Sequence, residues 1–485
     1  MPSSPSLLSL ETLGASVLNS SVLLRLLGAW LGYRLLLALY NVSPFHPLHK
    51  FPGPRLAAAT FLYEFWFDFV RHGRYVNEIR KMHEVYGPIV RINPEELHCL
   101  DSSFHRHYLN ANVGPVAVTA FGSETHEMHR MRRGPLNRFF SKAQMAKLEP
   151  SVQQLVQQLC DKLLAWTGPG KGPIDLTSAY NCLTGDTISQ YAFGEPRGFL
   201  DHEGWDHNYK VRGLVSLAPY FLDWMPETFA VLMRELYITI PGHVRQAMRD
   251  PKAGTVFTDL LDADLPPEEK TVYRLAADGF SLTGAGTETT ANMLTCATYF
   301  LLRYPEKRQR LEKELAKAGV DPKGKNLSWA QLEQIPYLYG VVHETLRMCH
   351  GLSTRLARVA RTEDLVYRNQ DGFGWGEPGK FEYVIPRGTP IGMSSGLTHR
   401  DASVFPDPEA FRPERWVTAK GERNTGLESL AMCELYLTVA AVVLRVAPRM
   451  KLVSENDDFV AMDHEVIIPK PKKGTKPIAV VISPE

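Results

Sequence analysis

One long apolar stretch, residues 272–303, constrains the fold of this chain more than any other feature. Apolar side chains recur along it without a solvated face, which is typical of a helix buried in a large core. At its centre, Gly284 and Gly286 leave the backbone of one face without side chains. Glycine in a helix interior lowers the stability of the helix by about 1 kcal/mol relative to alanine. We therefore expect another group, such as a flat cofactor, to approach this backbone closely.

The two residues after these glycines that matter chemically are Glu288 and Thr289. A threonine hydroxyl in mid-helix can bond back to the carbonyl four residues earlier, here Ala285, which predicts a local bulge with room for a water. Glu288 beside it can pass protons inward. Such an acid–alcohol pair suits oxygen activation, which needs protons delivered into a dry pocket. A buried helix with satisfied hydroxyls is the alternative, and these residues alone do not separate the two.

Length and composition limit the other classes of protein. The 485 residues contain no interior Pro/Gly/Ser linker, so we expect one large domain with an N-terminal appendage. Lys+Arg 54 against Asp+Glu 53 gives no overall electrostatic case for a nucleic-acid partner. The 6 cysteines lack paired spacings, which favours a reducing compartment and argues against a disulfide or metal framework.

The N-terminal appendage is largely apolar over residues 13–40, which is long enough for a membrane-spanning helix of about 20 residues. Arg25 and Arg34 interrupt it, each costing roughly 2.5–3.5 kcal/mol near the bilayer centre. A cleaved signal peptide fits poorly, because no basic residue precedes the apolar segment. The basic residues that follow it place the main domain in the cytoplasm. We expect a spanning or interfacial anchor over residues 1–40.

A proline-rich segment follows the anchor and reads Phe-Pro-Gly-Pro-Arg at positions 51–55. Prolines fix the backbone and stop a helix, so we expect a stiff hinge over residues 41–55. An ordinary loop is the alternative. The rest of the chain, residues 56–485, is then the globular domain.

Two groups of charged residues lie on predicted helices. In the cationic stretch 126–133, His129 and Arg133 stand four apart on one face, suited to holding a cofactor carboxylate, although a solvated basic face is the alternative. In the apolar helix 335–350, Glu344 and Arg347 are expected to be buried. A buried ion pair needs further partners or it destabilises the fold, and Arg415 is the candidate.

These motifs together resemble the cytochrome P-450 superfamily. Residues 285–290, Ala-Gly-Thr-Glu-Thr-Thr, are similar to its oxygen-binding helix. The Glu-x-x-Arg pair and the segment Pro-Glu-Arg-Trp at 413–416 follow in the family's order. The resemblance runs from about residue 50 to the C-terminus. It is closest in style to filamentous-fungal members that oxidise terpenoids and other secondary metabolites, such as trichodiene oxygenase-like enzymes.

The resemblance implies a mainly α fold, the cytochrome P-450 fold with a small β region and an N-terminal membrane anchor helix. It implies an endoplasmic reticulum membrane location with the main domain cytoplasmic. It also implies haem, and a monooxygenase reaction that inserts one oxygen atom of O2 into an apolar small molecule with electrons from NADPH-cytochrome P-450 reductase. The residue roles it implies are proton handling by Glu288 and Thr289, haem propionate binding by His129, Arg133 and Arg358, and structural support by Glu344, Arg347 and Arg415.

The segment that carries the family's haem ligand, Phe-x-x-Gly-x-Arg-x-Cys-x-Gly, is missing. Its cysteine thiolate binds the iron. If Gly426 is the last glycine of that motif, Asn424 takes the ligand's place, so the loop is lost near residues 423–426. Cys433 is the only cysteine after Arg415, but it lies in the predicted following helix, where a packing role is expected.

Two explanations of this loss stay open. The chain is either a truncated form of a haem-thiolate monooxygenase, through splicing or an erroneous exon boundary, or a haem-free pseudoenzyme or interaction protein with a P-450-like fold. The retained acid–alcohol pair and buried charges fit the first better. Residues 214–240, rich in Leu, Phe, Trp and Tyr, have two interpretations as well, a lid over an apolar substrate channel or plain core.

Overall fold

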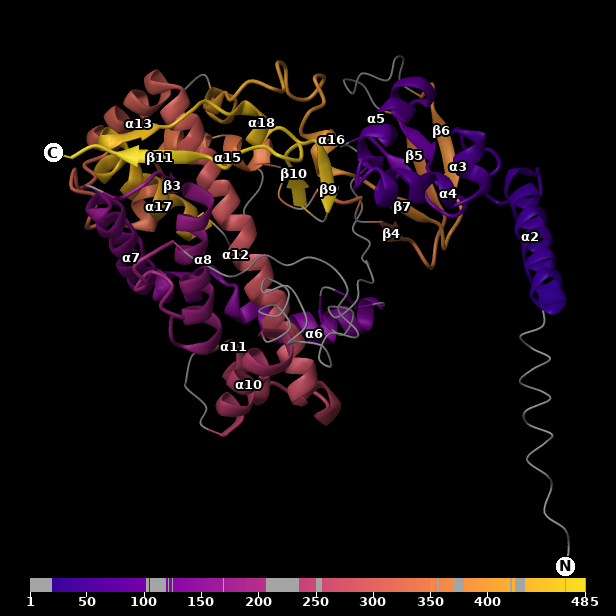
Figure 1. Ribbon diagram of the computed structural model, residues 1–485, viewed down its shortest axis with the longest axis horizontal. Helices are drawn as coiled ribbons and strands as arrows, with labels where there is room; N and C mark the ends of the chain where they lie inside the picture. Colours follow the sequence, from indigo (N-terminus) through magenta and orange to yellow (C-terminus); the bar gives the residue numbers. More distant parts are fainter. Residues whose placement is uncertain are drawn as a thin grey trace, which may run out of the picture. The chain divides into compact units, whose positions relative to one another are not determined.

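The computed structural model of the chain describes residues 20–101, 104, 119–120, 122–123, 125–168, 170–205, 235–249, 255–349, 351, 353–355, 357–369, 379–418, 421–423, 432–466 and 468–484. Helices dominate these residues, and the strands form small sheets (Figure 1). The predicted fold class, mainly α with a small β region, is confirmed. The chain divides into two compact units, Met1–Arg106 with Ala357–Met393 and His107–Leu356 with Ser394–Glu485, and each is described by itself.

The first unit contains the N-terminal helices and two sheets. Its helices are α2 (Ser20–Val42), α3 (Arg55–Ala59), α4 (Leu62–Phe65), the π-helix η1 (Trp66–Val70) and α5 (Tyr75–Tyr86). Its strands are β1 (Ile89–Arg91), β2 (Leu97–Cys99), β4 (Arg358–Val359), β5 (Leu365–Arg368), β6 (Glu382–Ile385) and β7 (Pro390–Gly392). The larger sheet has the order β1-β2-β7-β4, with β2 parallel to β7 and the other pairs antiparallel, and β5 pairs with β6.

Helix α2 covers most of the predicted anchor. The segment Val22–Val42 has a mean hydropathy of 1.7, and none of its most apolar window is buried, so length and composition allow it to cross a membrane. Residues 1–19 lie outside the described part of the chain. The C-terminal end of α2 is held in the first unit, since Asn41 Nδ2 donates to the Ala59 carbonyl at 3.0 Å. Arg91 Nη1 donates in turn to the Asn41 carbonyl at 2.9 Å.

The proline-rich hinge packs against strand β1. The Arg91 backbone N–H donates to the Pro52 carbonyl at 2.8 Å, and Phe51 is buried. A Cβ at position 53 would clash with the Arg91 carbonyl, so the close approach requires glycine there. Residues 51–53 are therefore held against the first unit, and a hinge over residues 41–55 stays a prediction.

The second unit holds most of the helices. They are α6 (His126–Phe139), α7 (Lys142–Ala165), α8 (Leu176–Phe193), η5 (Glu235–Thr239), α10 (Ile240–Arg249), α11 (Val256–Asp262), η6 (Pro267–Lys270), α12 (Val272–Arg303), α13 (Pro305–Lys317), α14 (Trp329–Leu332), α15 (Pro336–Cys349), α16 (Ser395–Thr398), η7 (Pro413–Trp416), α17 (Met432–Arg445), η8 (Ala447–Arg449) and α18 (Asp457–Val460). Its strands β3 (Ile174–Asp175), β11 (Ala479–Ile482) and β8 (Met450–Leu452) form an antiparallel sheet, and β9 (His464–Val466) pairs with β10 (Ile468–Lys470).

Helix α12 is the centre of the second unit, as the sequence predicts. It spans all 32 residues of the apolar stretch and packs on α8, α10, α15 and α17 (Figure 1). The Thr271 side chain caps its first turn by accepting from the Arg274 N–H, and Pro305 begins the next helix. Of the polar residues at its centre, Thr283, Thr287 and Thr290 are buried, whereas Glu288 is exposed and Thr289 is half-buried.

The structure corrects two expectations about this helix. A Cβ on Gly286 would lie 2.9 Å from Ile188 Cγ1 of α8, so helix packing, rather than a cofactor, accounts for that glycine. A Cβ on Gly284, by contrast, would meet nothing within 4 Å among the described residues. The helix is also α-helical along its whole described length, so the predicted bulge at Thr289 was wrong. Residues 214–240, interpreted as either a lid or plain core, lie mostly outside the described part of the chain.

Candidate active site

The acid–alcohol pair lies on an open face of α12. Gly284, Ala285 and Glu288 are exposed, and Thr289 is half-buried, although the helix is otherwise largely buried. The Thr289 hydroxyl donates to the Ala285 carbonyl at 2.6 Å, which confirms the predicted back-bond. An acid and an alcohol therefore occur side by side where the core opens.

Three other threonines of α12 fit the alternative interpretation, a buried helix whose hydroxyls are satisfied by its own backbone. Thr283, Thr287 and Thr295 are buried, and each hydroxyl donates to the carbonyl four residues earlier, at 2.7 to 2.8 Å. These are satisfied hydroxyls of a packed helix. Thr289 makes the same bond on the open face, so only its hydroxyl is also accessible to a molecule there.

Glu288 has a partner that the sequence analysis missed. Lys470 Nζ, at the end of β10, lies 2.5 Å from Glu288 Oε1, and the two side chains are 32% and 51% exposed. The residues are 182 positions apart in the chain. No local pattern signals such a pair, because it depends on how the β9–β10 hairpin packs against α12.

The predicted propionate-binding residues are distributed over both units. His129 and Arg133 are half-buried on α6, and the Arg133 guanidinium lies 5.1 Å from the centre of the Phe140 ring. Burial lowers the pKa of Arg133. Arg358 is half-buried at the start of β4 in the first unit. The role of these three residues toward a cofactor stays a prediction.

Arg132, between the two predicted residues, is a buried cation of α6. Its Nε and Nη2 atoms donate to the Glu269 carboxylate at 2.9 and 2.7 Å. Arg274 Nε donates to the same carboxylate at 2.8 Å, and Arg274 Nη1 pairs with Asp278 Oδ2 at 2.6 Å. All four side chains are at most 10% exposed, so two cations and two carboxylates neutralise one another inside the core. The i, i+4 spacing of Arg274 and Asp278 was the available sequence signal.

The predicted buried ion pair forms as expected. Glu344 accepts two hydrogen bonds from Arg347, at 2.9 and 2.8 Å, and both side chains are fully buried. Arg415 Nε lies 3.2 Å from Glu344 Oε1, which confirms it as the third member. Trp416 Nε1 donates to the other carboxylate oxygen at 2.9 Å. This cluster joins α15 to η7.

Cys433 does not fit the role of a haem-thiolate ligand. It is the second residue of α17 and only 4% exposed, and burial raises the pKa of its thiol to about 12. An iron ligand must be a thiolate that the metal can reach. Residues 424–431, which include Asn424 and Gly426, lie outside the described part and contain no cysteine. The residues present therefore lack the family's proximal ligand, and Cys433 packs in the core as predicted.

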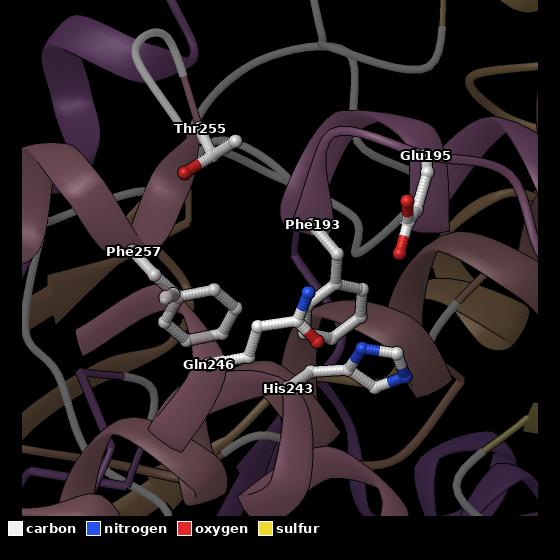
Figure 2. Close-up of a pocket in the computed structure, with 7 residues that line it drawn as sticks. Phe193, Glu195, His243, Gln246, Thr255 and Phe257 are labelled. Carbon is white, nitrogen blue, oxygen red and sulfur yellow. The ribbon is translucent and has the colours of Figure 1, made fainter. Parts of the chain in front are cut away.

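One small surface pocket lies elsewhere in the second unit. Figure 2 shows Phe193, His243, Gln246 and Phe257 lining it, and the rings of Phe193 and Phe257 stack at 5.3 Å. Its volume of about 20 Å³ suits a single water rather than a substrate. None of the predicted site residues lines it.

Comparison with known proteins agrees with this arrangement. The cytochrome P450 family model matches residues 107–433. The cytochrome P450 monooxygenase ppzE of Metarhizium majus is 38% identical, over 79% of this chain and 89% of its own length. Conidiogenone synthase PchP450 of Penicillium rubens and the cytochrome P450 monooxygenase TRI4 of Trichoderma arundinaceum are each 33% identical, over 90% of this chain and 95% and 90% of theirs.

These relatives are fungal proteins, which confirms the predicted resemblance to fungal enzymes of secondary metabolism. The residues that the family model matches include the open face of α12, the α6 cations and the Glu344 cluster. The chain belongs to the cytochrome P450 family, the haem-dependent monooxygenases that insert one oxygen atom of O2 into an apolar small molecule.

Proposed function

We propose that Glu288 and Thr289 are the proton-handling pair of this monooxygenase scaffold. The observation that carries the proposal is the open face of α12, where the Thr289 hydroxyl, bonded to Ala285, adjoins an ionisable carboxyl group. A carboxyl group can take a proton from solvent and pass it to a neighbouring hydroxyl, and a positioned pair of this kind speeds proton transfer. Lys470 holds the Glu288 carboxylate beside this face.

The other site residues divide into binding and support. His129 and Arg133, four apart on α6, and Arg358 on β4 would supply cations to the two propionates of haem. The cluster of Glu344, Arg347 and Arg415 would support the neighbouring core. The supporting observation is that every charged member of the cluster has its partner within 3.2 Å.

Helix α2 supports a proposal about the location of the chain. We propose that residues 1–40 anchor the chain in the endoplasmic reticulum membrane, that residues 41–55 are the hinge, and that residues 56–485 face the cytoplasm. There NADPH-cytochrome P-450 reductase would deliver electrons. The exposed apolar length of α2 and the fixed hinge support this assignment. A terpenoid is the first substrate class to test, because one relative is named for conidiogenone synthesis.

The missing ligand decides whether this chain is active as written. We propose that it is a form shortened near residues 423–426, because the motifs before that point and the helix predicted to follow it are kept. A haem-free scaffold or interaction protein is the second candidate, favoured by the burial of Cys433. Restoring Phe-x-x-Gly-x-Arg-x-Cys-x-Gly with Gly426 as its last glycine, so that the cysteine stands in the place of Asn424, separates the two candidates. Haem uptake and product formation by that variant support the first candidate, whereas their absence favours the second.

Replacing Thr289 by alanine in the loop-restored enzyme should uncouple reductant use from product formation. Because the hydroxyl no longer relays protons, we expect product per NADPH to fall about tenfold or more, while NADPH consumption continues. The measurement is the ratio of product to NADPH consumed. Thr287→Ala is the matched control, since that hydroxyl is buried and bonded to Thr283. An unchanged ratio in Thr289→Ala would refute the proposed role.

A further inference from the structure

Arg91 of strand β1 is a buried cation whose partners are all uncharged. The residue is only 2% exposed. Among the residues that the structure describes, its side chain bonds to two carbonyls and a histidine ring, and no carboxylate pairs with it. Burial lowers the pKa of Arg91 to about 10, so the guanidinium is still charged at neutral pH. A buried charge without a counter-charge depends on its hydrogen-bond partners, so these partners control whether Arg91 stays in place.

Two of these partners are carbonyl groups, and one of them belongs to the anchor helix. Arg91 Nη1 donates to the Asn41 carbonyl at 2.9 Å, and Arg91 Nη2 donates to the Pro94 carbonyl at 2.7 Å. Asn41 lies in the last turn of α2, where carbonyls lack helical partners and the helix dipole is negative. The guanidinium therefore caps the carbonyl end of α2 and ties it to β1.

His46 completes the set as a neutral acceptor. The residue is 9% exposed, and its Nδ1 atom lies 3.1 Å from Arg91 Nη2. The Leu48 backbone N–H donates to the same Nδ1 atom at 3.1 Å, so this nitrogen carries no proton. A proton on Nδ1 would leave the Leu48 N–H without its acceptor and would place two cations side by side in a buried site. Protonation of His46 is therefore incompatible with these contacts.

The charged groups around His46 oppose its protonation. Arg91 faces it from β1, His49 lies in the same turn, and the Tyr40 ring of α2 packs with its centre 5.4 Å from that of His46. Burial, followed by the charges of Arg91 and His49, lowers the pKa of His46 below its ordinary value of 6.5. A histidine with a lowered pKa contributes stability that is complete above its ordinary pKa and is lost as the pH falls through the lowered one.

Arg91 also holds the other end of the segment that follows α2. Its backbone N–H donates to the Pro52 carbonyl at 2.8 Å, and its carbonyl lies against Gly53. The side chain thus holds Asn41 while the backbone holds Pro52. If the side-chain contacts open, residues 43–51 connect a free end of α2 to a point that stays fixed. A further hydrogen bond, from Asn41 Nδ2 to the Ala59 carbonyl, joins neutral groups and does not respond to pH.

We propose that Arg91, through its contacts with Asn41, His46 and Pro94, holds α2 rigidly on the first unit at neutral pH, and that proton uptake by His46 releases the helix. We call these contacts the Arg91 clamp. Residues 43–51 then act as a hinge only in acid. The clamp lies within the first unit, and only its consequence, that the tilt of α2 in a membrane sets the tilt of this unit, rests on the proposed anchoring.

The test measures the distance between two spin labels in the full chain. All six native cysteines are buried, so the labels react selectively with introduced ones. Leu36→Cys reports α2 and Val384→Cys reports β6 of the same unit, at positions that are 68% and 56% exposed. Double electron–electron resonance gives the width of the distance distribution at about pH 7.5 and about pH 4.5, on either side of the ordinary histidine pKa. Detergent micelles make the result independent of whether α2 enters a bilayer.

We expect one narrow distance peak at the higher pH and its loss to a broad distribution at the lower pH. His46→Asn keeps an acceptor for the Leu48 N–H but cannot take up a proton, so its peak should stay narrow at both. His49→Asn, at an exposed histidine of the same turn, is the matched control and should broaden in acid like the unchanged chain. A peak that stays narrow in the unchanged chain, or equal broadening in His46→Asn, would overturn the inference.

A second variant tests the cation itself. Arg91→Lys keeps the charge, but one ammonium group cannot reach the carbonyls of Asn41 and Pro94 together with His46. We expect a broad distribution at both pH values, whereas Arg80→Lys, at an exposed position of α5, should stay narrow at the higher one. A narrow peak in folded Arg91→Lys would refute the clamp. If circular dichroism shows that this variant does not fold, the histidine variants decide alone. Failure of α2 to insert into vesicles would reject the anchor and leave these results unchanged.

Discussion

Replacing Glu344 by glutamine is expected to lower the free energy of unfolding by about 3–5 kcal/mol. The carboxylate is fully buried and, among the described residues, is the anion that pairs with Arg347, whose remaining N–H groups donate to the carbonyls of His399, Pro408 and Ala410. The amide would leave a buried guanidinium without its counter-charge. Its NH2 group could also no longer accept one of the hydrogen bonds that Arg415 and Trp416 of η7 donate to the two carboxylate oxygens.

The control for this substitution is an exposed ion pair. Arg368 and Glu382 lie 2.9 Å apart with 66% and 51% of their side chains exposed, so Glu382→Gln should change the unfolding free energy by about 0.5 kcal/mol or less. The midpoint of urea unfolding, followed by circular dichroism, compares the two. Equal shifts for both variants would show that the buried cluster is not a special source of stability.

The pH dependence of stability gives a second readout of Glu344. Burial alone would raise the pKa of Glu344, but the hydrogen bonds from Arg347, the Arg412 amide and Trp416 hold it below its ordinary value. A carboxyl group with a lowered pKa contributes stability that is complete above its ordinary pKa and is lost as the pH falls through the lowered one. Glu344→Gln should therefore lose stability less steeply in acid than the unchanged chain.

Replacing Glu269 by glutamine should have an effect of similar size, again about 3–5 kcal/mol. Its carboxylate faces both Arg132 and Arg274, and the remaining anion of the group, Asp278, pairs directly with Arg274. The substitution leaves the Arg132 guanidinium without its paired carboxylate, and the Ser123 hydroxyl, to which Arg132 Nη1 donates at 3.4 Å, is a weak partner for a buried charge. Helix α6 would lose its tie to the start of α12.

The neighbouring residue is the matched control for Glu269. Glu268 is exposed in the same short helix, η6, so Glu268→Gln should leave stability within about 0.5 kcal/mol. Urea unfolding of both variants, with proteolysis of α6 as a local probe, makes the comparison. If Glu269→Gln proves as stable as Glu268→Gln, the four buried charges do not depend on one another as the geometry indicates.

Contacts that are local in the sequence were predictable. The bond from Thr289 to Ala285 spans one helical turn. Glu344 and Arg347 lie three residues apart in an apolar helix, where an unpaired buried charge would destabilise the fold. Arg415 could be added because a buried pair needs a further partner. These inferences use helix periodicity and the cost of buried charge, both of which a sequence displays.

Contacts that depend on tertiary packing were not predictable. Lys470 reaches Glu288 across 182 positions, and Arg132 reaches Glu269 across 137. Arg132 enters the core, and its neighbours do not, because of which face of α6 is buried. The sequence does not indicate that face, because cations are spread over all sides of the helix. The exposed apolar side of α4 and η1 was not predictable either. The aromatic and acidic residues that alternate over positions 61–70 do not indicate which side of these helices meets water.

The decisive measurement is the absorbance spectrum of this chain after reconstitution with haem, reduction and exposure to carbon monoxide. Because Cys433 is a buried, protonated packing residue of α17, we expect no Soret band at the position of thiolate ligation, and no difference between this chain and Cys433→Ser. A thiolate-type Soret band that Cys433→Ser abolishes would contradict this, and would show that Cys433 reaches the iron.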